Sequence, residues 1–370
     1  MMVVDVTKTL KKPYTIKIGR RLHYSRKLSI LTTFFALILA FGVAGVFFAI
    51  IGLNPLEVYS YIGGVFTSPI LLLESLKRAI PIGLAALGLC VAFKMNFWNI
   101  GAEGQMYMGM FASTGVVLLH VYYGLFPDYL VLLLMILGAF FAGGLWCSLP
   151  AFLKAKMKVN EILTTLMMNY VAMYFVDFLV YGPWRDPKGY GFPLSIPFPD
   201  YSKLTIIFGE FAYGGLLLLC VTAVLVFIIL RYSKLGFELR IVGESIDTAR
   251  YAGINLSKVI TLGGFIAGGI AGIGGLTIVS GIIGRLRPRA SPGYGYTAII
   301  VGLLSALNPW LILPVSIFFG GLFVAGDILQ ATLKIPGAAV EMYQALIFLF
   351  IVIGEFMKRY QITITRGGDS

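Results

Sequence analysis

The sequence predicts an all-α, polytopic membrane protein, and composition, hydropathy and the spacing of charges each support this fold class. Hydrophobic residues make up 58% of the 370 residues, charged residues only 12%, and the mean hydropathy is +0.89. Soluble domains carry about a quarter charged residues, so this chain has too few charges to cover a surface that faces water. Long segments without a charge recur along the chain, as expected of helices that cross a bilayer.

These charge-free segments predict about ten transmembrane helices. In order they are Leu28–Gly52, Ala79–Phe93, Gly104–Tyr123, Tyr129–Leu153, Ile162–Val176, Phe211–Leu230, Val259–Gly284, two spans within Gly293–Gly326, and Gly337–Gly354. The segment Gly293–Gly326 is too long for one crossing and is divided at Asn308-Pro309, because proline disfavours helix at the residue before it. A single transmembrane domain therefore covers residues 28–357, between a basic tail (1–27) and a C-terminal tail (358–370).

An even number of spans places both termini on one side, and the basic residues indicate that this side is the cytoplasm. Lys and Arg gather in cytoplasmic loops, and this topology puts 20 of the 29 basic residues inside. The same bias explains the net charge of +12 without a nucleic-acid partner. The short second span, followed by the polar segment Lys94–Gly101, predicts a broken helix. This topology places Arg285, Arg287 and Arg289 on the outer side, contrary to the preference of basic residues for the cytoplasmic side.

Two loops and one span carry further information. In the inner loop, 231–258, Ser245 is able to cap a short helix and Gly253 to end it, which suits docking of a cytosolic partner but also fits a solvated loop. The proline-rich outer loop, 182–208, is either an ordered cap or a plain connector. In the seventh span Gly264, Gly268 and Gly272 recur every four positions, which predicts close helix packing.

Three motifs resemble those of permeases of binding-protein-dependent ABC importers. The segment Asn99–Gln105, Asn-Ile-Gly-Ala-Glu-Gly-Gln, resembles the signature of the nucleoside and simple-sugar branch of this family, which also holds ribose and branched-chain amino-acid permeases. Gly243-Glu244 with the following segment 249–254 resembles the loop that contacts the ATPase. Ser291–Ile299 resembles a motif of the second half, with Pro292 in place of a glycine and Thr297 in place of an acid. The resemblance extends over about residues 71–354.

The resemblance implies the membrane-spanning permease subunit of an ATP-driven importer for a nucleoside or a simple sugar. The implied partners are ABC ATPase subunits, an external solute-binding lipoprotein, membrane lipid, and a second permease that is either a shorter relative or an identical copy. The implied location is the plasma membrane of a prokaryote. We expect no catalysis, no metal and no cofactor in this chain: it has no Gly-X-X-X-X-Gly-Lys-[Ser/Thr] phosphate loop, so ATP and Mg²⁺ would bind to the separate ATPase.

The resemblance also assigns candidate roles to individual residues. The candidate solute pathway consists of Asn96, Asn99, Glu103, Gln105 and Asn169, although these groups would equally cap half-helices and satisfy one another. The candidate ATPase coupling loop contains Arg240, Gly243, Glu244, Ser245, Asp247, Ala249, Tyr251 and Gly253. Arg285, Arg287 and Arg289 are the candidate contact for the binding protein, with lipid headgroups as the alternative.

An ion-coupled secondary transporter of a small polar solute is the main alternative function. Such transporters hold their coupling ions with charges or unwound backbone near the membrane midplane. The predicted spans are nearly free of charge, which disfavours a proton relay but leaves open a sodium site made of carbonyl groups. The two functions differ in a measurable way, since only the importer would require a separate ATPase and a binding protein.

Overall fold

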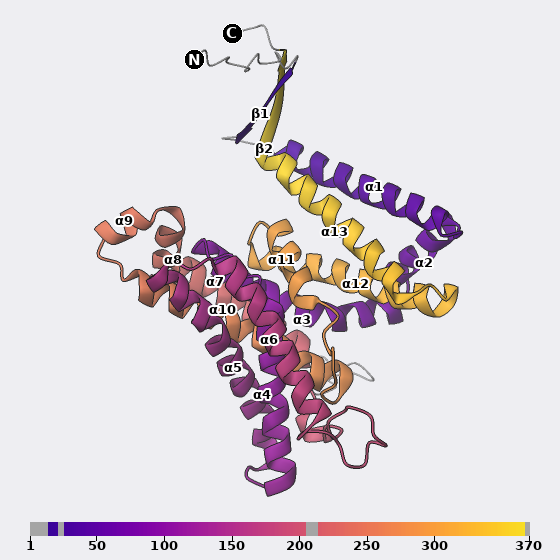
Figure 1. The fold of residues 1–370 in the computed structure, drawn as a ribbon, viewed down its shortest axis with the longest axis vertical. Helices are drawn as coiled ribbons and strands as arrows, with labels where there is room; N and C mark the ends of the chain where they lie inside the picture. The colour runs from indigo at the N-terminus through magenta and orange to yellow at the C-terminus, as the bar shows by residue number, and fades with distance from the viewer. Residues whose placement is uncertain (1–13, 21–25, 205–213, 367–370) are drawn as a thin grey trace, which may run out of the picture. The chain divides into compact units, whose positions relative to one another are not determined.

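A computed structural model describes residues 14–20, 26–204 and 214–366, and shows a mainly helical chain (Figure 1). The chain forms two compact units, residues 59–335 and residues 1–58 with 336–370. Among the described residues, seven helices are long and apolar enough to cross a membrane. They are α3 (Pro69–Lys94), α5 (Asp128–Met157), α6 (Glu161–Tyr181), α7 (Gly214–Tyr232), α10 (Leu256–Thr277) with η2 (Ile278–Ile283), α12 (Pro309–Leu333), and the apolar part of α13 (Gly337–Arg359). A multi-pass helical membrane protein is thereby confirmed in outline.

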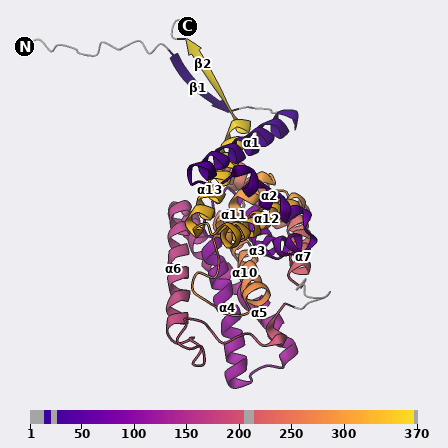
Figure 2. The ribbon, with the colours of Figure 1, turned by 90° about the vertical axis from the view of Figure 1, so that its right-hand side faces the viewer.

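In the larger unit, α10 packs against α3, α5 and α4 (Ala102–Tyr123), and α4 also packs against α5 and α6 (Figures 1 and 2). Glycine residues allow the backbone of α10 to lie in direct contact with the backbone of α5. A Cβ atom added at Gly268 or Gly272 would overlap a backbone oxygen of α5, and one added at Gly264 would overlap the side chain of Ala151. The close packing predicted from the small residues of this span is confirmed.

Two segments differ from the predicted spans. Helix α3 begins ten residues before the expected start and includes Arg78, whose charge is paired with Asp327 on α12. The polar segment after it is a turn that joins α3 to α4, so the predicted break lies between two helices. Helix α11 (Tyr294–Leu304) has only 11 residues, about 16 Å of helix, which is roughly half of the hydrocarbon thickness. Helix α12 begins at Pro309, where the sequence predicts a boundary.

One end of the larger unit collects the ends of α3, α5 and α8 (Lys234–Glu244) and the starts of α6 and α10; we call it the basic end. Here Lys154 Nζ donates to the backbone oxygen of Asn96 and to Glu161 Oε1, each at 2.5 Å. A Cβ at Gly243 would overlap the backbone oxygen of Lys94, so α8 lies directly on the end of α3. The short helix α9 (Ile246–Tyr251) follows α8 and extends beyond these packed helices (Figure 1).

The opposite end of the larger unit, the loop end, is covered by residues 182–204, which include the short helix η1 (Asp200–Ser202). Ser280 Oγ at the end of the long helix donates to the Ser202 backbone oxygen at 2.7 Å. The ring of Trp184 stacks on that of Phe111 with centroids 5.2 Å apart. The described part of this loop is therefore an ordered cap, and residues 205–208 lie outside the described chain. A hydrogen bond from Lys203 lowers the pKa of the exposed Asp200 carboxyl.

The smaller unit contains the helices α1 (Arg26–Ile50) and α13, together with the strands β1 (Tyr14–Arg20) and β2 (Tyr360–Arg366); α2 (Pro55–Thr67) crosses the division. The rings of Phe48 and Tyr343 join α1 to α13 at 5.5 Å. The strands pair antiparallel, with Tyr14 opposite Arg366 (Figure 2). An all-α fold does not predict this ribbon. The β-branched residues Thr and Ile favour strand in both segments, and the antiparallel helices bring them together.

Candidate functional site

The signature motif 99–105 forms the turn that precedes α4 and the first residues of that helix. The side chains of Asn99 and Gln105 are hydrogen-bonded twice: Asn99 Nδ2 donates to Gln105 Oε1 at 3.1 Å, and Gln105 Nε2 donates to Asn99 Oδ1 at 2.9 Å. Asn99 Oδ1 also accepts from the Gly101 N–H at 2.9 Å. The paired amides thus hold the backbone in the turn and satisfy each other's polar atoms, which burial would otherwise make costly.

Helix α6 supplies a second set of hydrogen bonds to the same turn. Asn169 Oδ1 accepts from the Gly104 N–H at 2.8 Å, while its Nδ2 donates to the Ile100 backbone oxygen at 2.9 Å and to Tyr296 Oη at 3.2 Å. Thr165 Oγ1 accepts from the Ile100 N–H at 3.1 Å. The first N–H groups of a helix have no partner within it, so Asn169 provides one for the start of α4 and links it to α11.

Glu103 lies where the N-termini of α4 and α11 meet. Its Oε2 accepts from the Gly295 N–H at 2.7 Å, and its carboxylate also hydrogen-bonds with the Ser291 side chain and the Gly293 backbone. A Cβ at Gly295 would overlap the backbone of Glu103, so α11 begins this close only because residue 295 is glycine. The positive end of a helix dipole stabilises a carboxylate, and here two helix starts converge on one.

The structure brings four of the five predicted pathway residues into this buried network. Asn99, Glu103, Gln105 and Asn169 are each at most 4% exposed. Asn96 lies apart from them at the basic end; its side chain is exposed and accepts from Trp98 Nε1 at 3.2 Å. The contacts are those of caps on two helix starts, and a role for these residues along the solute pathway stays a prediction.

Four further residues complete the network, and none of them has a role predicted from the sequence: Thr165, Ser291, Gly295 and Tyr296. The signal available for three of them was the second-half motif itself, in which two glycines flank a tyrosine. The first, Gly293, has φ of +92° and precedes α11, a conformation that favours glycine. Thr165 follows the Asn160 cap of α6 by five residues and gave no signal, since threonine is common in apolar helices that cross a membrane.

The predicted coupling loop folds into α8 and α9. Ser245 Oγ accepts from the Thr248 N–H at 3.2 Å and caps α9, and Gly253 follows α9 with φ of +73°. Both features agree with the predicted cap and stop. Helix α8 packs against the bundle through the buried residues Leu239 and Val242. The loop is therefore an ordered element joined to the helices behind it.

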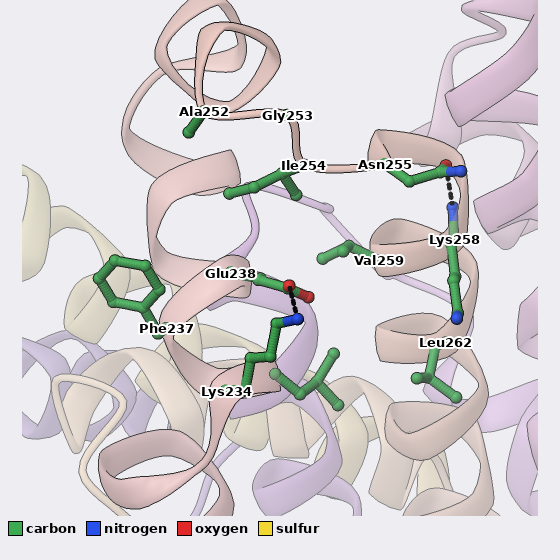
Figure 3. Close-up of a pocket in the computed structure, with 11 residues that line it drawn as sticks. Lys234, Phe237, Glu238, Ala252, Gly253, Ile254, Asn255, Lys258, Val259 and Leu262 are labelled. Carbon is green, nitrogen blue, oxygen red and sulfur yellow. Dashed lines mark hydrogen bonds and ion pairs between the residues drawn. The ribbon is translucent and has the colours of Figure 1, made fainter.

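Helix α9 differs from α8 because most of its side chains face solvent. Tyr251 is 98% exposed and Ile246 is 49% exposed, whereas Ala249 is buried against the rest of the unit. Arg240, Glu244 and Asp247 are exposed as well. A cavity of about 650 Å³ opens between α8, the turn after α9, and α10. Figure 3 shows the pair Lys234–Glu238 on α8, 3.8 Å apart, across this cavity from α10.

The arginines 285, 287 and 289 follow the long helix at the loop end, and their environments differ. Arg289 Nε lies 3.6 Å from Asp177 Oδ2 on α6, and its guanidinium lies 5.5 Å from the centre of the Tyr174 ring. Arg287 is exposed and Arg285 is half-buried; neither forms an ion pair within the described chain. The charge of Arg289 is thus balanced inside the chain. Contact of this group with a binding protein stays a prediction.

Known proteins are similar in sequence to this chain over most of its length. The family described as "Branched-chain amino acid transport system / permease component" matches residues 71–354. The chain is 35% identical to the glucose ABC transporter permease protein TsgB13 of Haloferax volcanii over 90% of each chain. It is 28% identical to the guanosine ABC transporter permease protein NupP of Bacillus subtilis, over 87% of this chain and 92% of that protein. It is 27% identical to the nucleoside ABC transporter permease protein NupB of Lactococcus lactis, over 88% of this chain and 91% of that protein.

The family match covers the same residues over which the motifs resemble those of ABC permeases. The matched residues include the network around Glu103 and the loop with α8 and α9. They also include the seven helices that are long and apolar enough to cross a membrane, except for the first two residues of α3. The chain belongs to this family and is a multi-pass membrane permease of an ABC transport system.

Proposed function

We propose that this chain forms one half of the translocation pathway of an ATP-driven importer for a nucleoside or a simple sugar. The similarity to a glucose permease and to guanosine and nucleoside permeases over about nine-tenths of their lengths carries this proposal. The signature motif favours a nucleoside, while the relative with 35% identity is a glucose permease. We therefore retain both solutes, with a branched-chain amino acid as a distant third.

In the proposed topology the chain crosses the plasma membrane of a prokaryote as ten segments. These are the seven apolar helices together with α1, α4 and, because α11 alone is too short to cross, α11 with residues 290–293 before it. The basic end lies in the cytoplasm, because Lys94, the lysines at the end of α5 and the basic residues of the α8–α9 loop gather there. Both termini lie on the same side, and the loop end faces outward.

In the proposed mechanism, α9 transmits the movement of an ATPase to the membrane helices. Tyr251 and its neighbours are free to enter a groove on that partner, which holds ATP and Mg²⁺. Helix α8 then passes the displacement on through two contacts. Gly243 touches the end of α3, and Leu239 packs beside Gly263 of α10. Packed helices move as rigid bodies, so the bundle would alternate between outward and inward access.

The proposed partners at the other end are an external solute-binding lipoprotein and, alongside in the membrane, a second permease. The ordered loop 182–204 provides a firm surface for docking, and Arg285 and Arg287 provide positive charge beside it. Charges at the rim of an interface mainly steer the encounter. Replacement of both arginines by alanine should therefore weaken docking most at low salt.

The test is ATP hydrolysis by this chain reconstituted in lipid vesicles with its ATPase, the second permease and the binding protein. Guanosine, adenosine, ribose, glucose and leucine are added one at a time on the side that holds the binding protein. Stimulation by nucleosides alone or by sugars alone would support the importer and name its solute class. The contrary result is uptake by this chain alone, driven by a sodium or proton gradient and independent of ATP. That result would replace the importer with a secondary transporter.

A further inference from the structure

Three tyrosine side chains lie at the surface of the larger unit, next to the buried network. Tyr170 and Tyr174 occupy successive turns of α6, and Tyr296 belongs to the first turn of α11. They are 45%, 59% and 36% exposed, respectively. We call these three residues the tyrosine strip.

The strip lies at a depth where phenol groups are unfavourable in lipid. Tyr170 and Tyr174 are the tenth and fourteenth of the 21 residues of α6, about 14 and 20 Å from its start. Tyrosine hydroxyls in membrane proteins favour the two interfaces, and a polar group without a hydrogen bond in hydrocarbon costs free energy. The hydroxyls of Tyr170 and Tyr174 make no hydrogen bond within the described residues.

Helix α5 shows what a lipid-facing surface looks like in the same unit. Its exposed residues in the corresponding stretch are Leu133, Leu137, Phe141, Leu145 and Leu149. None of these side chains carries a polar atom, so they suit hydrocarbon. The exposed face of α6 also carries apolar side chains, among them Met167, Val171 and Phe178, but it differs from that of α5 in presenting two phenol hydroxyls at its middle turns, although both helices are long enough to cross the membrane. This difference indicates that the strip faces a polar environment.

Polar contacts connect both ends of the strip to the rest of the unit. At one end, Tyr296 Oη accepts from Asn169 Nδ2 at 3.2 Å, which joins the strip to the network around Glu103. At the other, the guanidinium of Arg289 lies 5.5 Å from the centre of the Tyr174 ring and is paired with Asp177. The exposed polar surface thus runs from the centre of α6 toward the loop end.

We propose that the tyrosine strip is the wall of the translocation pathway that contacts the solute, an inference that rests on the proposed importer function. The ring faces would stack on a nucleobase or on the C–H face of a sugar, and the hydroxyls of Tyr170 and Tyr174 would hydrogen-bond with solute hydroxyls. The buried polar residues then act as positioning groups. Asn169 holds the Tyr296 hydroxyl, and Glu103 holds the helix start from which Tyr296 projects.

The experiment is ATP-driven uptake of radiolabelled guanosine and glucose by the complete assembly in vesicles. The double variant Tyr170→Leu/Tyr174→Leu removes rings and hydroxyls, and Tyr170→Phe/Tyr174→Phe removes the hydroxyls alone. Loss of aromatic stacking should raise KM for the transported solute about tenfold in the leucine variant. The phenylalanine variant should change KM less and should discriminate less between guanosine and 2′-deoxyguanosine.

The control is Tyr122→Leu, which makes the same chemical change at an exposed tyrosine near the end of α4; its KM should equal that of the wild type. An unchanged KM in the leucine double variant would overturn the inference. Loss of co-purification with the second permease in that variant would also overturn it, because the strip would then be a subunit interface. If the wild-type assembly takes up no nucleoside and no simple sugar with ATP, the proposed importer function itself fails, and the inference fails with it.

Discussion

The start of α4 and the helix α9 are both built from short segments that combine small and polar residues, and they differ in where those polar groups are satisfied. Around Glu103 the side chains are buried and hydrogen-bond within the chain. On α9 most side chains face outward, and Tyr251 is almost fully exposed. A segment that satisfies its polar groups internally is required for the fold, whereas an outward-facing segment is available to a partner. Substitutions should separate the two regions in the same way.

The largest effect is expected for Glu103→Leu. This change leaves the buried Gly295 N–H without its acceptor and also removes the carboxylate from beside the Gly293 backbone and the Ser291 side chain. An unsatisfied buried donor costs about 1–3 kcal/mol, so the free energy of unfolding should fall by roughly 3 kcal/mol or more. Thermal unfolding of the purified permease in detergent, followed by size-exclusion chromatography, measures this loss.

Glu103→Gln is the matched control, because glutamine keeps an oxygen that accepts from Gly295. It should lose much less stability than the leucine variant. Equal destabilisation by both variants would contradict the capping role. A glutamine variant that unfolds like the wild type but transports poorly would place Glu103 on the solute pathway after all.

A smaller loss of stability is expected for Gly295→Ala. The added Cβ atom would overlap the Glu103 backbone, which has no freedom to move aside because it begins α4. Overpacking of this kind costs about 1–3 kcal/mol. On the same helix, Gly302→Ala is the control: its Cβ would meet its nearest neighbour, the Ala86 oxygen, at 3.9 Å, an ordinary contact. If the two variants unfold at the same temperature, the close approach of the helix starts is not needed for stability.

Local features of both regions could be predicted from the sequence, because each depends on residues close together in the chain. The cap at Ser245 and the stop at Gly253 follow from residue types at a set spacing. The packing of α10 through Gly264, Gly268 and Gly272 follows from their four-residue repeat. Most spans follow from charge-free segments, since hydrocarbon excludes ions whatever the tertiary structure is.

Features that depend on distant partners could not be predicted. Arg78 indicated a span boundary in the sequence, yet it lies inside α3 because Asp327, 249 residues away, pairs with its charge. Glu103 and Gly295 are separated by 192 residues, so the motif that contains each gave no sign of the other. The tyrosine strip could not be predicted for the same reason, since the exposure of one face of α6 depends on which helices cover its other faces.

In contrast to the changes around Glu103, Tyr251→Ala should leave the fold intact and impair coupling. Substitutions of exposed residues usually change stability by less than about 0.5 kcal/mol, so the unfolding temperature should stay the same. An aromatic anchor at an interface contributes about 1–2 kcal/mol or more, so solute-stimulated ATP hydrolysis should fall about tenfold. Tyr232→Ala, at another exposed tyrosine near the basic end, should hydrolyse ATP like the wild type. Full stimulation in the Tyr251 variant would mean that the ATPase docks elsewhere.

The smallest effect is expected for Ser245→Ala, which removes the cap of α9 but no contact of the bundle. Loss of a serine cap costs about 1 kcal/mol, and α9 has only six residues, so it should open locally while the bundle stays folded. Hydrogen exchange should quicken by about fivefold for the amides of α9 and stay unchanged in α8. Ser245→Asp, which keeps a good capping side chain, should exchange at the wild-type rate. Faster exchange throughout α8 and α10 in the alanine variant would show that α9 is part of the packed core, and the contrast between the two regions would no longer hold.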